Sequence, residues 1–91
     1  MMAEKLKIIV AEDEELIRNV LINRIQKEEY LEIIGVAKDG KEELDLIKQS
    51  KPDLVITDIT MPNITGIEVI EILNKENYNP TFIVMSGEVR I

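Results

Sequence analysis

The sequence predicts an α/β protein built on a doubly wound parallel sheet. Short apolar runs of strand length alternate with segments whose apolar residues recur at helical spacing, in the order β-α-β-α-β-α-β. This alternation favours parallel strands with helices on both faces, joined by right-handed crossovers. In addition, three of the apolar runs lead into side chains with oxygen chemistry, which are Glu12-Asp13, Asp58 and Ser86. The functional crevice of such a sheet lies outside the carboxyl ends of its strands, so we expect these side chains to form a site.

The four expected strands are short and rich in β-branched residues. They are Leu6 to Ala11, Glu32 to Ala37, Asp53 to Asp58 and Thr81 to Met85. The first is an apolar run with charged residues at both ends, which is typical of a strand that is buried on both faces.

The first of three expected helices runs from Leu16 to about Glu29 and carries an apolar stripe, with its basic side chains off that stripe. The stripe consists of Leu16, Ile17, Val20, Leu21 and Ile25, and the basic residues off it are Arg18, Arg24 and Lys27.

The other two helices have recognisable beginnings. The second starts at Asp39, which forms a capping-box pattern with Glu42, and ends at Lys51-Pro52. The third starts with the capping box of Thr65 and Glu68 and is broken by the segment from Asn77 to Pro80. Its apolar face is expected to contain Ile67, Ile70 and Leu73. We expect the acidic side chains of the helices to lie on solvated faces.

Composition excludes several kinds of chemistry. The chain has 91 residues, enough for one domain over residues 1–91, and its 11 Lys and Arg against 18 Asp and Glu give a net charge of −7. That charge makes a poor surface for nucleic acid. The chain contains no Cys and no His, which excludes disulfides, thiolate and imidazole metal sites, and Ser-His or Cys-His catalysis. Any chemistry must therefore use carboxylates, hydroxyls and amines.

The N-terminal apolar run from Ile8 to Ala11 is too short for the core of a signal peptide and is followed at once by acids. It is also too short to span a membrane. We therefore expect a cytoplasmic protein that does not bind membranes.

The acids Glu12, Asp13 and Asp58 follow the first and third expected strands. If these strands are neighbours, their backbones lie about 4.8 Å apart and their terminal carboxylates meet. Crowded carboxylates raise one another's pKa unless a cation lies among them. The sequence therefore predicts a divalent-metal site with one carboxylate left free to react. The simpler alternatives are that Glu12 and Asp13 favour the start of a helix through its dipole, and that Asp58 begins a turn.

Four motifs occur together in this chain. They are the acidic pair Glu12-Asp13, the segment 35–40 (Gly-Val-Ala-Lys-Asp-Gly), the segment 58–66 (Asp-Ile-Thr-Met-Pro-Asn-Ile-Thr-Gly) and Met85-Ser86-Gly87. Together they resemble the receiver domains of two-component response regulators, over nearly the whole chain from Lys5 to Gly87. The most specific of them is Met-Pro placed four residues before Gly, just after a strand-ending Asp. The resemblance implies a flavodoxin-like receiver fold with strand order 2-1-3-4.

The resemblance also implies a function. Asp58 would accept a phosphoryl group from a sensor histidine kinase or a phosphotransfer protein, and the change would control an output domain in a longer parent chain. Mg²⁺, with Mn²⁺ as a substitute, would be held by Glu12, Asp13, Asp58 and the backbone carbonyl of Thr60. Mg²⁺ prefers such oxygen ligands, and a weak carboxylate nucleophile needs its charge.

Three further residues have implied roles. Ser86 would donate its hydroxyl to the new phosphate and act as the phosphate-sensing switch, although a hydroxyl at a strand end is also a common turn former. Pro62 and Gly66 would shape the loop after Asp58, as a rigid position and a position of close approach.

The family pattern continues with a fifth strand that ends in Lys and with two more helices, whereas this chain stops at Ile91. We therefore expect a receiver domain that lacks the fifth strand and last two helices. The fourth strand would then be an apolar sheet edge, and part of the stripe formed by Leu16, Val20 and Ile25 would lose its cover. Because exposed edges and apolar patches favour association, we expect the chain to self-associate through its fourth strand.

Two other functions remain open from the residues alone. A haloacid-dehalogenase-like phosphatase would also use Asp58 as a nucleophile, but that family has a second acid two residues later, where this chain has Thr60. A receiver-like interaction module would never be phosphorylated. We favour the phosphoacceptor, which is a signalling domain and not an enzyme beyond its own phosphorylation and dephosphorylation.

Overall fold

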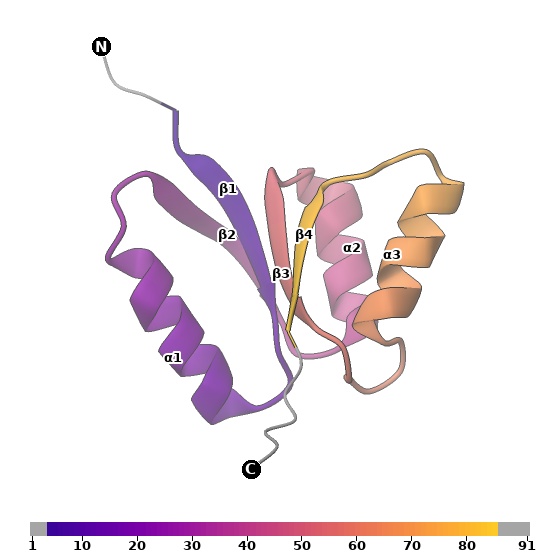
Figure 1. Cartoon of the computed structure of the whole chain (residues 1–91), viewed down its shortest axis with the longest axis horizontal. Coiled ribbons are helices and arrows are strands. Elements are labelled where there is room, and N and C mark those ends of the chain that lie inside the picture. Colours follow the sequence, from indigo (N-terminus) through magenta and orange to yellow (C-terminus); the bar gives the residue numbers. More distant parts are fainter. Residues whose placement is uncertain (1–3, 86–91) are drawn as a thin grey trace.

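The structure, a computed structural model, describes residues 4–85 and contains one parallel sheet with the strand order β2-β1-β3-β4 (Figure 1). The strands are β1 (Leu6–Ala11), β2 (Leu31–Ala37), β3 (Leu54–Asp58) and β4 (Thr81–Met85). Their bounds agree with the expected strands to within one residue. The predicted fold class and strand order are confirmed.

The register of the strands brings their carboxyl ends to one edge of the sheet. Ala11, the last residue of β1, pairs with Ala37 of β2 on one side and with Thr57 of β3 on the other. At the end of β3, Asp58 pairs with Met85 of β4. Glu12, which follows β1, is therefore a neighbour of Asp58, which ends β3.

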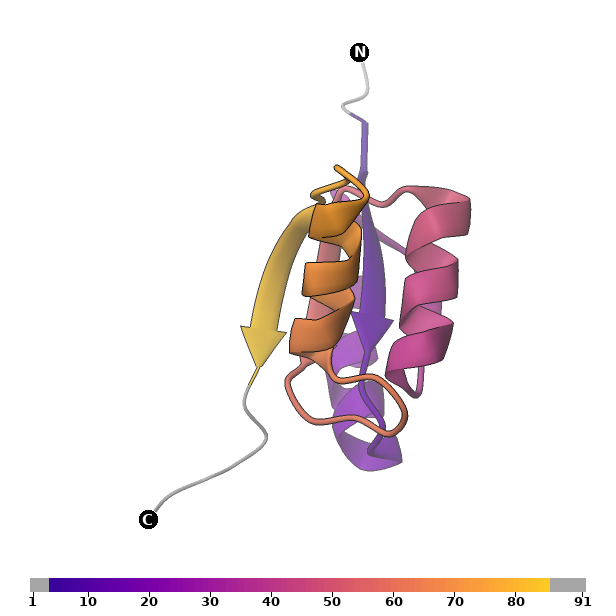
Figure 2. The same cartoon turned by 90° about the vertical axis from the view of Figure 1, so that its right-hand side faces the viewer.

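Helices cover the two faces of the sheet unequally. Helix α1 (Glu15–Gln26) lies on one face, and α2 (Gly40–Ser50) and α3 (Gly66–Lys75) lie on the other (Figures 1 and 2). Helix α1 packs against β1 and β2. Within residues 4–85, no helix covers β3 and β4 on the face of α1 (Figure 1).

Local signals start and stop the helices on the opposite face. The carboxylate of Asp39 accepts a hydrogen bond from the backbone N–H of Glu42 at 2.8 Å, and α2 ends at Lys51, which adopts the left-handed conformation before Pro52. At the start of α3, the Thr65 hydroxyl and the Glu68 carboxylate each accept a backbone N–H of the other residue. The predicted capping box of α3 is therefore present.

Two apolar clusters form most of the core, one on each face of the sheet, and a small third cluster contains Ala11, Ala37 and Met61. The larger one, between the sheet and α2 and α3, contains Ile9, Ile47, Val55, Val69 and Leu73. The smaller one, beneath α1, contains Ile8, Val10 and Ile25. Because β1 supplies fully buried residues to both, the prediction that this strand is buried on both faces is confirmed.

The apolar stripe of α1 is covered only in part, as predicted. Leu16 and Val20 have exposed fractions of 77% and 60%, which confirms the expected loss of cover, whereas Ile25 is buried. Ile17, which was also placed on the stripe, is exposed as well. Arg18, which was expected off the buried stripe, is buried. The helix also ends at Gln26 instead of Glu29. The exposed residues have no cover because α1 packs only against the β1–β2 half of that face of the sheet. Arg18 is buried because it has backbone partners near the sheet, which the hydrophobic pattern could not indicate.

The predicted buried face of α3 is also wrong at one position. Ile67 is exposed, and the buried positions are Gly66, Val69 and Leu73. Gly66 must approach the carbonyl oxygen of Asp58, where a Cβ would clash. That contact sets the rotation of the helix, so the residues three and seven positions further on face the sheet.

Candidate functional site

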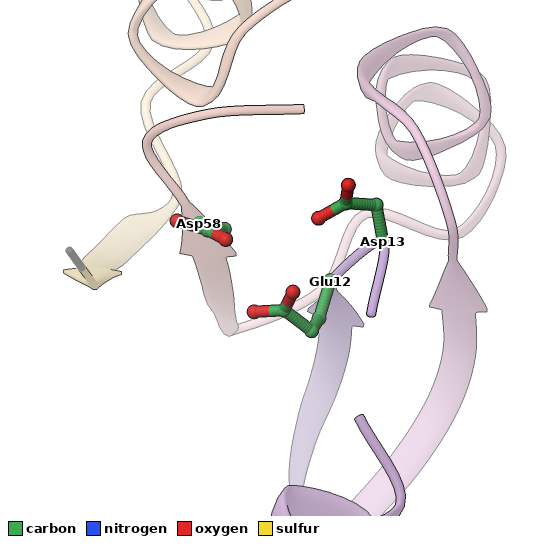
Figure 3. Close-up of side chains that lie close together, drawn as sticks. All are labelled: Glu12, Asp13 and Asp58. Carbon is green, nitrogen blue, oxygen red and sulfur yellow. The ribbon is translucent and has the colours of Figure 1, made fainter. Parts of the chain in front are cut away.

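Three carboxylates converge at the carboxyl edge of the sheet (Figure 3). Glu12 and Asp13 follow β1, and Asp58 ends the neighbouring strand β3. One carboxylate oxygen from each residue lies within 4.8 Å of the others. Glu12 and Asp58 have exposed fractions of only 2% and 6%, whereas Asp13 is exposed. The structure therefore brings the three predicted acids together, two of them buried and one at the rim.

The electrostatics of this cluster favour a cation. Burial raises the pKa of Glu12 to about 7, opposed by a 3.0 Å hydrogen bond from the backbone N–H of Glu14. The negative charge of Asp58 and the contacts with the carboxyl groups of Asp13 and Asp58 raise this pKa further. A divalent cation among these oxygens would remove that repulsion. The donor set, made only of carboxylates, fits a hard cation such as Mg²⁺.

The loop after β3 turns back onto Asp58. The backbone N–H of Thr60 donates to Asp58 Oδ1 at 3.4 Å, and the N–H of Gly66 donates to the carbonyl of Ile59 at 3.1 Å. A Cβ at Gly66 would clash with the carbonyl oxygen of Asp58 and lie 2.9 Å from Thr57 Oγ1. Only glycine allows α3 to begin this close to Asp58.

The same loop is attached to the start of α2. The carbonyl of Pro62 accepts hydrogen bonds from the N–H groups of Gly40 at 3.4 Å and Ile64 at 2.9 Å. A Cβ at Gly40 would clash with the backbone of Ile64. Gly40 was noted in the sequence only as part of a motif, and its contact with the loop was not predicted because it joins segments more than twenty residues apart.

Arg18 contacts the candidate site, and this contact was not predicted from the sequence. Its Nη1 donates to the backbone carbonyls of Glu12 at 3.0 Å and Asp13 at 3.4 Å. The guanidinium therefore holds the acidic pair from the first turns of α1, which accounts for its burial. The available signal was its position, five residues after Asp13 on the helix that follows the pair.

Other predicted site features differ in how far the structure describes them. Ser86, the expected phosphate-sensing residue, lies outside residues 4–85. The backbone N–H of Thr60 donates to Asp58, and the role of the Thr60 carbonyl as a metal ligand stays a prediction.

In the described part of the chain, none of the helices has the length and apolar character needed to cross a membrane.

A parallel sheet of this order with carboxylates clustered at the ends of β1 and β3 is the arrangement that the sequence predicted for a receiver fold. The family model described as response regulator receiver domain matches residues 8–91. The chain belongs to the response regulator receiver domain family.

Several known proteins are similar to this chain. Over 80 residues it is 39% identical to the protein-glutamate methylesterase/protein-glutamine glutaminase of Lawsonia intracellularis. The matched region covers 88% of this chain and 22% of the relative. The response regulator domain of Thermotoga maritima CheB superposes with a TM-score of 0.83 at 33% identity, covering 92% of this chain and 62% of that one. A DNA-binding response regulator of the LuxR family from Staphylococcus aureus gives a TM-score of 0.86 at 30% identity, with coverage of 93% and 71%.

The chain spans between a fifth and a quarter of the length of the curated relatives it matches, from 22% to 24%. The activities in those relatives' names therefore belong to proteins several times longer than this chain.

Proposed function

We propose that this chain is a phosphoacceptor module in which Asp58 takes a phosphoryl group from a partner protein. The observation that carries the proposal is the convergence of Glu12 and Asp13 on Asp58, a buried carboxylate at the end of a central strand. Membership of the receiver family supports the same chemistry. No other carboxylate in the described chain has two further acids so close.

In the transfer, an oxygen of Asp58 attacks the phosphorus atom of the donor. A new O–P bond forms, the P–N bond of the donor phosphohistidine breaks, and the leaving imidazole keeps the electron pair and takes a proton. Because these 91 residues contain no His, the phosphohistidine would lie outside them, on a sensor histidine kinase or a phosphotransfer protein. The backbone N–H of Thr60, already directed at Asp58, orients the carboxylate.

The proposed metal ligands are Glu12, Asp13, Asp58 and the backbone carbonyl of Thr60. When bound there, Mg²⁺ or Mn²⁺ would neutralise the charge of the phosphoryl group. The acids contribute by placing their oxygens around one point at the strand ends, and Arg18 contributes by fixing the backbone of the first two. Ser86 is proposed to bind the phosphate through its hydroxyl after the transfer.

We propose that the phosphorylated module controls an output segment of a longer protein in the cytoplasm, since its relatives are several times longer than this chain. The module itself would be a switch, with no turnover beyond its own phosphorylation and dephosphorylation. A receiver-like interaction module that is never phosphorylated is the alternative.

The test is the intact mass of the chain after incubation with acetyl phosphate and Mg²⁺. We expect the gain of one phosphoryl group, its loss in Asp58→Asn, and its retention in Asp45→Asn, a matched change of an exposed acid on α2. Equal phosphorylation of Asp58→Asn would reject Asp58 as the acceptor. A folded wild-type chain that gains no mass with any donor would favour the interaction module, and turnover of varied phosphoesters would favour a phosphatase.

A further inference from the structure

Glu43 is a fully buried carboxyl group that the proposed chemistry does not use. It lies on α2, where acidic side chains were expected to be solvated, and that prediction is wrong for this residue. Its Oε1 is 3.1 Å from the hydroxyl of Thr57, the residue before Asp58. Its Oε2 is buried and has no hydrogen-bond partner among the described residues. A buried, half-satisfied carboxyl group is costly and needs a physical explanation.

The hydrogen bonds around Thr57 supply that explanation. Its Oγ1 lies 3.1 Å from Glu43 Oε1 and 3.2 Å from the backbone carbonyl oxygen of Asp58. A hydroxyl has only one hydrogen, so it cannot donate to both oxygens at once. If Glu43 carries a proton, it donates to Thr57, and Thr57 donates to Asp58. If Glu43 is ionised, it competes with the carbonyl of Asp58 for the single hydrogen.

We propose that Glu43 acts as a positioning residue for Asp58, through the hydrogen bonds that link its carboxyl group to Thr57 and Thr57 to the carbonyl of Asp58. Gly66 begins α3 against that same carbonyl and against Thr57 Oγ1. The chain of hydrogen bonds therefore lies at the point where β3, α2 and α3 meet beneath the acidic site. This inference rests on the proposed role of Asp58 as phosphoacceptor.

The pKa of Glu43 supports a neutral form. Burial raises it to about 7, and the hydrogen bond from Thr57 opposes the rise. Burial and Thr57 are the causes of this shift. The elements around α2 also carry charged residues, on them or directly after them, which are Lys7, Glu12, Glu32, Asp58, Glu68, Glu71 and Lys75. Both forms of Glu43 are therefore populated near neutral pH, and its ionisation weakens the hydrogen bond to Asp58.

The first test does not depend on phosphorylation. The carboxyl ¹³C signal of Glu43, assigned by its absence in Glu43→Gln, should titrate with a midpoint near 7. The amide signals of Ile59 and Gly66 should change more through this midpoint in the wild type than in Glu43→Gln, because the amide of the variant donates to Thr57 at every pH. Glu12, whose pKa is also about 7, is common to both proteins and cancels in the difference. A midpoint at the ordinary value of 4.5 would overturn the inference, as would amides that ignore the titration.

The second test measures the rate of Asp58 phosphorylation by acetyl phosphate and Mg²⁺ against pH. We expect the ratio of the wild-type rate to the Glu43→Gln rate to be near one at about pH 6, and to fall roughly threefold by about pH 8, the effect of one weakened hydrogen bond. Asp45→Asn, an exposed change on the same helix, should keep a constant ratio to the wild type. In Thr57→Val, which lacks the hydroxyl, Glu43→Gln should have no further effect on the pH profile.

The two tests separate the possible failures. If Glu43 titrates as expected and Asp58 accepts no phosphoryl group at any pH, the proposed function fails and the hydrogen-bond chain stands. If Asp58 is phosphorylated and the rate ratio is constant across the titration of Glu43, the positioning role is rejected and the proposed function stands.

Discussion

The guanidinium of Arg18 donates a 3.0 Å hydrogen bond to the backbone carbonyl of Glu12, so a helical side chain holds the strand end that carries the acidic pair. The bond is buried, and the same Nη1 also reaches the carbonyl of Asp13. The position of both acids therefore depends on α1 as well as on β1. This dependence leads to the first prediction.

Arg18→Ala should weaken Mg²⁺ binding by about tenfold, because residues that orient metal ligands typically contribute that much to affinity. Arg24→Ala removes an exposed Arg from the same helix and should leave the affinity unchanged. Amide chemical shifts during a MgCl₂ titration give the dissociation constants. If both variants bind Mg²⁺ like the wild type, Arg18 has only a packing role.

Neutralising the acidic pair should weaken Mg²⁺ binding more strongly. Glu12→Gln and Asp13→Asn each remove one proposed ligand charge, and we expect losses on the order of ten- to a hundredfold. Glu14→Gln is the matched control, since Glu14 is the next acid along the chain and its side chain makes no capping hydrogen bond. Isothermal titration with Mg²⁺ compares the three. An equal loss in Glu14→Gln would indicate an effect of net charge rather than a site.

Gly66→Ala should destabilise the fold although alanine is the better helix former. The added Cβ meets the carbonyl oxygen of Asp58, which cannot move without shifting β3. We expect the clash to lower the free energy of unfolding by about 1–3 kcal/mol, which outweighs the gain of roughly 0.5–1 kcal/mol from helix propensity. Urea denaturation measures it, with Glu71→Ala, an exposed change on α3, as the control. A more stable Gly66→Ala would show that the contact is not restrictive.

The pKa of Glu43 predicts how stability depends on pH. It rises from 4.5 to about 7 on folding, so between these values the folded state binds more protons than the unfolded state. The free energy of unfolding must therefore fall as pH rises through this window and level off above about pH 7. Relative to Glu43→Gln, the wild type should lose on the order of 3 kcal/mol across it. Glu12 is common to both proteins and cancels in the difference. Parallel curves from urea denaturation would contradict the prediction.

The sequence predicted those features that depend on local signals or on topology. Strand ends and helix caps depend on a few adjacent residues, so Asp39, Thr65 and Glu68 could be assigned in advance. The meeting of Asp13 and Asp58 followed from the strand order, because parallel neighbours end at the same edge of a sheet.

Features that depend on a distant partner were not predicted. Arg18 was placed off the apolar stripe, and the acidic side chains of the helices, which include Glu43, were placed on solvated faces; charged residues are rarely buried without a partner. Their partners are the carbonyl of Glu12 and the hydroxyl of Thr57, and neither contact is visible in a hydrophobic pattern. Conversely, Ile17 was placed on the apolar stripe and is exposed, because periodicity shows which side of a helix is apolar, but not how much of it the sheet covers.

The last prediction concerns β4. Within residues 4–85 this strand pairs only with β3, so its other edge presents unpaired backbone groups. Ile83 and Val84 of this strand are exposed, at 49% and 38%, and Leu16 and Val20 of α1 are exposed as well. We expect the 91-residue chain to self-associate through this edge, since unpaired strands and apolar patches both favour pairing with another chain.

Ile83→Lys should shift the chain toward monomer, and Ile67→Lys, on the exposed side of α3, should not. Light scattering coupled to size exclusion over a range of concentrations measures this. A wild-type chain that stays monomeric at every concentration and melts cooperatively would show that the edge of β4 is not an interface.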